Sequence, residues 1–395
     1  MEKTPNANRL HIGIFGRTNA GKSTVLNAIT GQEVSLVSKI SGTTTDPVYK
    51  PMELHPIGPC VFIDTAGMDD DGVLGEKRIE KTKSVIDKTD LALLVFSGDE
   101  ISHEKKWAEL LKENNVPTVF VLNKIDQNPD YKKTAEKIEE IFGKYPVLIS
   151  GKEKRNIQTL INEIAKNVPD DFEKESITAD LVKEDDVVLL VMPQEIQAPK
   201  GRLILPQVQT IRDLLDNKCV VCSTTTDKFH VAVNSLKKEP DLIITDSQVF
   251  DFVYKNKPKN SRLTSFSVLF ASYKGDAKEY VRGAEFVDTL KENSKILIAE
   301  SCSHKQLKED IGRVKIPAML KKRFGEKLTI DIKAGNDFPE DLTGYDLVIQ
   351  CGGCMFNRKH ILSRIEKAKK QNVPITNYGI FIAKMNNILD KIDIV

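Results

Sequence analysis

One short segment constrains the fold of this chain more than any other. The segment GRTNAGKS, from Gly16 to Ser23, follows an apolar strand pattern and precedes a helical pattern. It has the form G-x-x-x-x-G-K-S, in which the glycines let backbone N–H groups curl around phosphates and the following helix points its positive end at the same anions. We expect Gly16 and Gly21 to shape a phosphate loop, Lys22 to reach the β- and γ-phosphates, and Ser23 to supply its hydroxyl to Mg²⁺. A chance glycine-rich turn is the alternative, and the flanking strand and helix disfavour it.

Two further segments come in the order of a nucleotide switch. SGTTTDP, residues 41–47, is a candidate first switch loop, in which one of three consecutive threonines reaches Mg²⁺ when the γ-phosphate is present; we favour Thr44. VFIDTAG, residues 61–67, is a strand that ends at Asp64, and Gly67 is placed to contact the γ-phosphate. The predicted catalytic residues are Lys22, Thr44, Asp64 and Gly67, with Ser23 and Thr44 on Mg²⁺.

Two later segments predict which base of the nucleotide the chain recognises. FVLNKID, residues 120–126, places Asp126 at a strand end, where its carboxylate can accept two N–H donors that guanine offers and adenine does not. ISGK, residues 149–152, fits a second loop that contacts the base. The full predicted nucleotide-binding set is Gly16, Asn19, Gly21, Lys22, Ser23, Thr24, Asn123, Lys124, Asp126, Ser150 and Gly151.

With these four elements in order, residues 8–168 resemble the translation-factor-type GTPases, and most closely the TrmE/Era class. The resemblance implies GTP hydrolysis. Met68 stands where many of these GTPases carry a glutamine that positions water, so we expect slow intrinsic turnover. In TrmE-like members an asparagine at the place of Asn19 holds K⁺, which makes Asn19 a candidate potassium ligand. The alternative is an asparagine favoured for its turn geometry.

Composition sets the class of molecule. A chain of 395 residues with 40% hydrophobic and 29% charged residues is typical of a soluble protein with several domains. Its formal net charge of +1 indicates no general attraction to nucleic acid or to membrane surfaces. No apolar run is long enough to span a bilayer, and the opening MEKTPNANRL lacks the apolar region of a signal peptide. We therefore expect a cytoplasmic protein.

Beyond the first third, strand and helix patterns alternate, which predicts parallel sheets covered by helices. The predicted fold class is α/β: a P-loop GTPase domain followed by two further α/β domains with mainly parallel sheets. We expect domains at residues 1–170, 171–265 and 266–395. The middle domain contains no catalytic constellation, so we expect it to mediate assembly of a homodimer.

The six cysteines are candidates for ligands or buried apolar residues, since structural disulfides are rare in the cytoplasm. Cys60 precedes a strand and is expected in the core. Cys219 and Cys222 form a C-x-x-C inside an apolar strand, where side chains three positions apart point to opposite faces. We therefore expect these two cysteines to be buried rather than metal-bound.

The remaining cysteines come after predicted strands. KILIAESCSHKQ ends a strand before Cys302 and His304, and YDLVIQCGGC ends another before Cys351 and Cys354. Parallel strands end at one edge of a sheet, so these four side chains are expected to converge. Three thiolates suit zinc with His304 as the fourth ligand, or a 4Fe-4S cluster with one iron open to an exchangeable ligand. Ordinary strand-end cysteines are the alternative.

The order of a TrmE-like GTPase, a motif-poor α/β segment and C-x-H…C-x-x-C resembles the FeFe-hydrogenase maturation GTPases of the HydF family over essentially the whole chain. The family pattern ends in H-C-x-x-C, and here Gln350 stands where that histidine belongs. The resemblance implies a 4Fe-4S cluster on Cys302, Cys351 and Cys354. Its fourth ligand is left open between His304, a carboxylate such as Asp185 or Asp186, and solvent.

The resemblance further implies a GTP-hydrolysing scaffold that receives a di-iron precursor of the hydrogenase H-cluster. By the same resemblance, two radical-SAM maturases supply the parts of this precursor, and the precursor is then transferred to apo FeFe-hydrogenase. The main alternative is a TrmE/Era-like GTPase that acts on RNA or the ribosome and carries a structural C-terminal zinc, but the sequence lacks the basic, aromatic face that RNA binding needs. A third interpretation, a dithiol redox enzyme, is weakened by Cys302 and His304.

Overall fold

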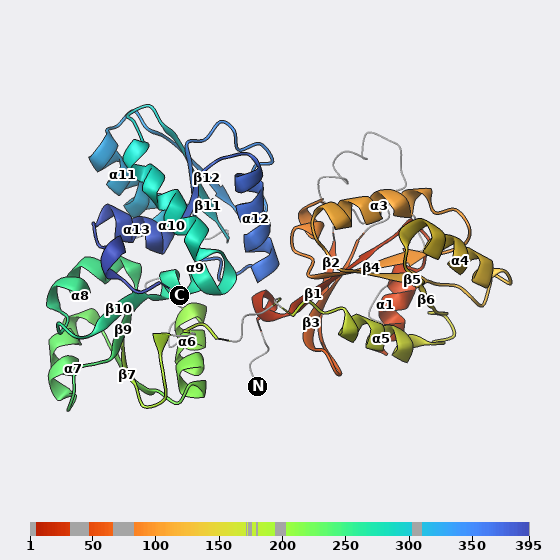
Figure 1. Cartoon of the computed structure of the whole chain (residues 1–395), viewed down its shortest axis with the longest axis horizontal. Helices are drawn as coiled ribbons and strands as arrows, with labels where there is room; N and C mark the ends of the chain where they lie inside the picture. The colour runs from red at the N-terminus through yellow and green to blue at the C-terminus, as the bar shows by residue number, and fades with distance from the viewer. Residues whose placement is uncertain are drawn as a thin grey trace. The chain divides into compact units, whose positions relative to one another are not determined.

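The structure is a computed structural model. It describes residues 5–31, 47–65, 83–170, 172, 176–178, 181–193, 203–301 and 310–394. The chain divides into two units, Met1–Glu173 and Lys174–Val395, each built around its own sheets (Figure 1).

A six-stranded sheet with the order β2-β3-β1-β4-β5-β6 forms the centre of the first unit. Only β2 runs antiparallel to its neighbour within the described residues. The central strands β1 and β4 are buried along their whole length, which is why their sequences are nearly continuous apolar runs. The strands are β1 (Leu10–Phe15), β2 (Val48–Leu54), β3 (Gly58–Asp64), β4 (Leu91–Phe96), β5 (Thr118–Leu122) and β6 (Val147–Leu148).

Helices cover both faces of this sheet and form two hydrophobic clusters with it. Cys60 is fully buried in one of them, as expected. Two helices end at glycines in the left-handed conformation, Gly31 and Gly143, where a side chain would be strained. The described helices are α1 (Lys22–Thr30), α3 (Ser102–Glu113), α4 (Tyr131–Phe142) and α5 (Ile157–Lys166).

The second unit contains two four-stranded sheets, each wholly parallel in its described strands. The first has the order β10-β9-β7-β8, with β8 at one edge. Its strands are β7 (Val187–Val191), β8 (Val220–Thr224), β9 (Leu242–Thr245) and β10 (Arg262–Ser265). Its helices are α6 (Leu205–Asp216), α7 (Phe229–Ser235) and α8 (Phe250–Asn256).

The second sheet has the order β12-β11-β13-β14, so β11 and β13 are its two central strands. Its strands are β11 (Lys295–Glu300), β12 (Thr329–Ala334), β13 (Leu347–Gln350) and β14 (Ile375–Asn377). The last of these strands ends at Asn377. The side chain of Asn377 accepts a hydrogen bond from the Ile380 backbone N–H at 2.9 Å, which starts a helix at Tyr378.

Helix α9 joins the two sheets of this unit, since it contacts β10 of the first and β14 of the second. Eight of its nine residues are buried, so it is surrounded by protein. Helix α10 lies close on β14, because a Cβ on Gly283 would meet the Ile375 carbonyl oxygen at 1.9 Å. The helices of this region are α9 (Phe266–Lys274), α10 (Ala277–Glu285), α11 (Ile316–Phe324), α12 (Arg358–Lys370) and α13 (Tyr378–Met385).

The predicted fold class is confirmed: a P-loop-type sheet is followed by two further, mainly parallel sheets with helices. The described helices include none with the length and apolar character that crossing a membrane requires.

Candidate functional site

The first candidate site is the loop between β1 and α1. Gly16 has φ 139°, and a Cβ there would lie 2.3 Å from the Val95 carbonyl oxygen, so only glycine fits. The ammonium group of Lys22, which is 7% exposed, donates hydrogen bonds to the carbonyls of Gly16 at 2.7 Å and Arg17 at 2.9 Å. The lysine thus holds its charge within the loop, where it can meet an anion.

Beside this loop, a hydroxyl and a carboxylate approach each other. Ser23 lies in the first turn of α1, and Asp64 is the last residue of β3. The Ser23 Oγ donates to Asp64 Oδ2 at 2.8 Å. Oxygen ligands of this kind suit Mg²⁺. The other two predicted catalytic residues, Thr44 and Gly67, lie outside the described residues, as does Met68.

Asn123, at the end of β5, ties the phosphate loop to the predicted base loop. Its Nδ2 donates to the Ala20 carbonyl at 3.0 Å, and its Oδ1 accepts the Gly151 N–H at 3.0 Å. A Cβ on Gly21 would lie 2.4 Å from the same Nδ2, so the loop passes directly against this amide. Thr24 is also at this junction, since its methyl group lies 3.3 Å from where a Gly151 Cβ would be.

Asp126 follows β5 and presents an acceptor beside Ser150 of the predicted base loop. Its Oδ1 is buried and has no hydrogen-bond partner among the described residues. A hydrogen bond from the Ser150 side chain, more than the charge of Lys152, holds the pKa of Asp126 below its ordinary value. The group is therefore a carboxylate at neutral pH and has an acceptor left for a ligand.

Asn19 adopts the left-handed conformation with φ 63°. Its backbone carbonyl accepts a hydrogen bond from Lys124 Nζ at 2.5 Å. Asparagine is one of the few residues that tolerate the left-handed conformation, so the turn geometry by itself accounts for an asparagine at this position. The potassium role stays a prediction.

The second candidate site is at the carboxyl ends of β11 and β13. These strands pair in parallel, with Ala299 opposite Gln350. The Cys351 N–H donates to the Ala299 carbonyl at 2.9 Å. Ser301 lies against the Cys351 sulfur, with its N–H at 3.1 Å and its Oγ at 2.9 Å from Sγ. Cys302 comes next in the chain, but it and His304 lie outside the described residues.

Cys354 lies in the loop that continues from Cys351. Gly353 has φ 68°, and a Cβ there would lie 2.5 Å from Ile361 Cδ1, so the turn needs glycine. Burial raises the pKa of the Cys354 thiol, and the charge of Cys351 adds to the rise, while the ammonium group of Lys274 opposes it. The two cysteines of this C-x-x-C are thus close enough for their charges to interact.

Two further residues bear on the cluster: Gln350, which stands in place of the family's histidine, and Asp186, one of the candidates for a fourth ligand. Gln350 is fully buried, and its Nε2 donates to the Tyr280 hydroxyl at 2.9 Å, so this side chain points toward α10. Asp186 accepts the Lys183 N–H at 3.1 Å and forms an ion pair with Arg262 at 3.8 Å.

Asp186 precedes β7 and therefore lies at the amino-terminal edge of its sheet, and Asp185 is its neighbour there. Lys274, which bonds to the cysteine loop, comes after the carboxyl end of β10. Parallel strands start at one edge and end at the other, so this placement disfavours Asp185 or Asp186 as the fourth ligand, which stays a prediction.

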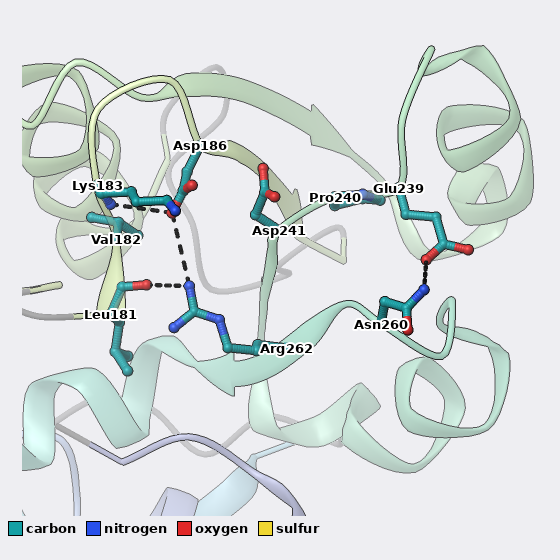
Figure 2. Close-up of a pocket in the computed structure, with 9 residues that line it drawn as sticks. All are labelled: Leu181, Val182, Lys183, Asp186, Glu239, Pro240, Asp241, Asn260 and Arg262. Atoms are coloured by element: carbon teal, nitrogen blue, oxygen red, sulfur yellow. Dashed lines mark hydrogen bonds and ion pairs between the residues drawn. The ribbon is translucent and has the colours of Figure 1, made fainter.

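A pocket opens at this amino-terminal edge, and Figure 2 shows its lining. Arg262 donates to the Leu181 carbonyl at 2.5 Å as well as pairing with Asp186. Asp241 accepts the Val187 N–H at 2.7 Å. These charges are engaged in holding the chain before β7 to the sheet, and we assign the pocket a structural role.

Cys219 and Cys222 lie on opposite faces of their sheet. Cys219 belongs to a cluster with Leu190 and Leu214, and Cys222 packs against a different cluster that contains Leu189. This agrees with the strand geometry expected for the pair. Within the described ranges, which leave out Cys302 and His304, no group of three or more His, Cys, Asp or Glu side chains is arranged to hold a metal ion.

Sequence reasoning missed one residue at the cysteine site. Lys274, the last residue of α9, donates from Nζ to the carbonyls of Gly353 at 3.3 Å and Phe356 at 2.8 Å. The available signal was a lysine that ends an otherwise uncharged helix, FSVLFASYK, just before a glycine.

The strand, loop and helix around Lys22 together with the aspartate that ends β3 define a P-loop GTPase. Residues 11–124 match the family model of the 50S ribosome-binding GTPase. The chain is 34% identical over 176 residues to GTPase Der of Sulfurimonas denitrificans, covering 41% of this chain and 35% of Der. It is 29% identical over 208 residues to GTPase Era of Aquifex aeolicus, covering 49% of this chain and 67% of Era. It thus spans about a third of the length of Der.

A solved structure of Aquifex aeolicus Era bound to GDP and AlF4⁻ aligns with a TM-score of 0.37 and 20% identity, covering 54% of this chain and 92% of that one.

Two more matches cover most of the second unit. Residues 177–275 match the dimerization domain of hydrogen maturase F, and residues 278–393 match its tetramerization domain. Together they account for more than half of the chain. The chain belongs to the hydrogen maturase F family.

We expect Asn123→Ala to weaken GDP binding and to destabilise the first unit by about 1–3 kcal/mol, because it leaves the Ala20 carbonyl and the Gly151 N–H without their buried partner. Calorimetric titration with GDP and thermal unfolding measure the two effects. Asn128→Ala is the matched control, since that side chain lies beyond the same strand and, among the residues that the structure describes, bonds to Thr134 and Asp130 instead. Unchanged GDP affinity in Asn123→Ala would contradict the bridging role.

Proposed function

We propose that this chain is a GTP-hydrolysing scaffold of FeFe-hydrogenase maturation. It holds a 4Fe-4S cluster on Cys302, Cys351 and Cys354, receives a di-iron precursor of the H-cluster and transfers it to the apo-hydrogenase. The observation that carries the proposal is the contact of Ser301, the residue before Cys302, with the Cys351 sulfur, in a chain that matches hydrogen maturase F domains.

The donor set fits such a cluster. Cys351 and Cys354 come after one central strand, and Cys302 comes after the strand paired with it. Thiolates are the ligands that iron–sulfur clusters prefer, and three of them leave one of four irons for His304 or for solvent. When bound, the cluster supplies an iron with an exchangeable position. Cys351 and Cys354 are both half-buried, so the residues around them shield their thiols from water in part.

The test of the cluster is iron and acid-labile sulfide per chain after anaerobic reconstitution. We expect about four of each in the wild type and loss of both in the Cys302→Ser/Cys351→Ser/Cys354→Ser variant. Cys219→Ser/Cys222→Ser is the matched control and keeps the cluster, because those cysteines lie on opposite faces of a sheet.

Zinc without sulfide in this experiment would favour the second candidate function, a GTPase that acts on RNA or the ribosome with a structural zinc. The match of residues 11–124 to a ribosome-binding GTPase model is the observation in its favour.

The nucleotide site serves as the switch of the scaffold in this proposal. The Ser23 hydroxyl and Asp64 carboxylate supply oxygen near the place of Mg²⁺, and Asp126 keeps an acceptor for guanine. Switch loops that order around the γ-phosphate and relax after hydrolysis change partner affinity in other GTPases. We infer that GTP hydrolysis controls the association of this chain with the hydrogenase and with the two radical-SAM maturases.

We expect the dissociation rate from apo-hydrogenase to differ at least about fivefold between the chain loaded with a non-hydrolysable GTP analogue and the chain loaded with GDP. Surface-based binding kinetics measure it. Ser23→Ala, which removes the hydroxyl beside Asp64, should abolish the difference. Equal rates in the wild type would exclude the switch.

The proposed binding of K⁺ by Asn19 can be tested through the rate of GTP hydrolysis. We expect GTP hydrolysis to be roughly tenfold or more faster in K⁺ than in Na⁺ at equal ionic strength, because an added cation stabilises charge on the phosphates. Asn19→Gly should lose this dependence while keeping the loop, since glycine adopts φ 63° without strain. If Asn19→Gly retains the potassium effect, the residue serves the turn alone.

The family domains matched by the second unit are named for dimerization and tetramerization. We propose a homodimer assembled through the first sheet of this unit, whose edge strand β8 has its first residue, Val220, 52% exposed. Light scattering of the purified chain gives the oligomeric state, and a monomeric mass would exclude the dimer.

A further inference from the structure

A buried ammonium group lies next to the cysteine loop. Lys274 is 2% exposed and ends α9, a helix that is otherwise uncharged and surrounded by protein. Lysine is rarely buried unless its charge is compensated nearby, because removing an ammonium group from water is costly. The helix end is one source of compensation, since the carbonyls of the last turn favour a positive charge.

The described contacts of Lys274 point to the loop as a second source. Its Nζ donates to the Phe356 carbonyl at 2.8 Å and to the Gly353 carbonyl at 3.3 Å. These two carbonyls lie on either side of Cys354 in the sequence. A single side chain from α9 therefore fastens the loop on both sides of a predicted cluster ligand.

Helix α9, which carries this lysine, lies near the cysteine loop at both of its ends. Ser267, in its first turn, accepts the Gly379 N–H at 3.1 Å and has its Oγ 4.0 Å from where a Gly352 Cβ would lie. Ser267 and Lys274 both fall within residues 177–275, the part that matches the dimerization domain. The region that lacks recognisable motifs thus contributes two contacts to the cysteine edge.

The charge of Lys274 lies beside the loop that carries the thiols. Its ammonium group bonds to the carbonyl of Gly353, the residue before Cys354, and to that of Phe356, two residues after it. Inside a protein the effective dielectric constant is low, so a buried charge acts more strongly on its neighbours than an exposed one does. An iron–sulfur cluster on thiolates is anionic and gains a further negative charge on reduction, and nearby charge is one of the factors that set its potential.

We propose that Lys274 is a positioning residue of the iron–sulfur site, whose ammonium group fixes the C-x-x-C loop and stabilises the reduced, more negative form of the cluster. This inference rests on the function proposed above. It assigns to α9 a role in setting the reduction potential of the cluster, beyond holding the two sheets together.

Three substitutions of Lys274 separate the effect of its charge from the effect of its packing. Lys274→Gln keeps a hydrogen-bond donor but removes the charge, Lys274→Met removes both, and Lys274→Arg keeps the charge. Lys278→Met is the matched control, because Lys278 is exposed on α10 four residues further on and water screens its charge. Each chain is reconstituted anaerobically, its iron and sulfide are counted, and its cluster is titrated with a reductant while EPR monitors the reduced form.

We expect Lys274→Gln to hold wild-type iron and to show about a tenfold lower ratio of reduced to oxidised cluster at a fixed ambient potential. For a one-electron couple this is a midpoint about 59 mV more negative. Lys274→Arg should stay near the wild-type midpoint, and Lys278→Met should equal it. Loss of iron from Lys274→Met alone supports the loop-fixing part of the proposal.

Two outcomes overturn the proposal. One is an unchanged midpoint in iron-loaded Lys274→Gln. The other is loss of iron from all three Lys274 variants, including Lys274→Arg, with wild-type thermal unfolding, since this excludes the charge as the relevant property. A wild-type chain that takes up no iron and sulfide instead overturns the proposed function, so the two failures are distinguishable.

Discussion

The parallel pairing of β11 with β13 is the interaction that forms the candidate cysteine site of the second unit. It sets Ala299 opposite Gln350, and the strands then end together, so that Ser301 meets the sulfur of Cys351. Two segments that are far apart in the sequence thereby deliver their polar residues to one place. A ligand set assembled in this way needs no preformed motif, because the sheet itself brings its parts together.

Helix α9 connects the two sheets of the second unit. It comes after β10 of the first sheet and packs against β14 of the second, with nearly all of its side chains buried. Through Ser267 it bonds to the backbone of α13, which follows the edge strand β14, and through Lys274 to the loop that follows the central strand β13. We infer that these bonds offer a physical route between the packing of the two sheets and the proposed cluster site.

The nucleotide site is organised by hydrogen bonds rather than by apolar packing. Lys22 bonds to the carbonyls of its own loop, and Asn123 joins that loop to the backbone at Gly151. Positive φ angles at Gly16, Asn19 and Gly21 give the loop its curl. Groups held in this way do not need to reorganise when an anion arrives, which is the condition for strong electrostatic binding.

From the residues alone we could predict the phosphate loop, the segments expected to contact the base, the fold class, and the opposite facing of Cys219 and Cys222. These features depend on neighbours along the chain: the sterics of glycine, the period of a strand, the start of a helix. Three other features required the folded structure: the bond of Gln350 to Tyr280, the place of Asp186 at the amino-terminal edge of its sheet, and the contact of Lys274 with the cysteine loop. Each of these depends on which strands pair and which helix lies between the sheets, and the local pattern of the residues that take part does not specify such long-range packing.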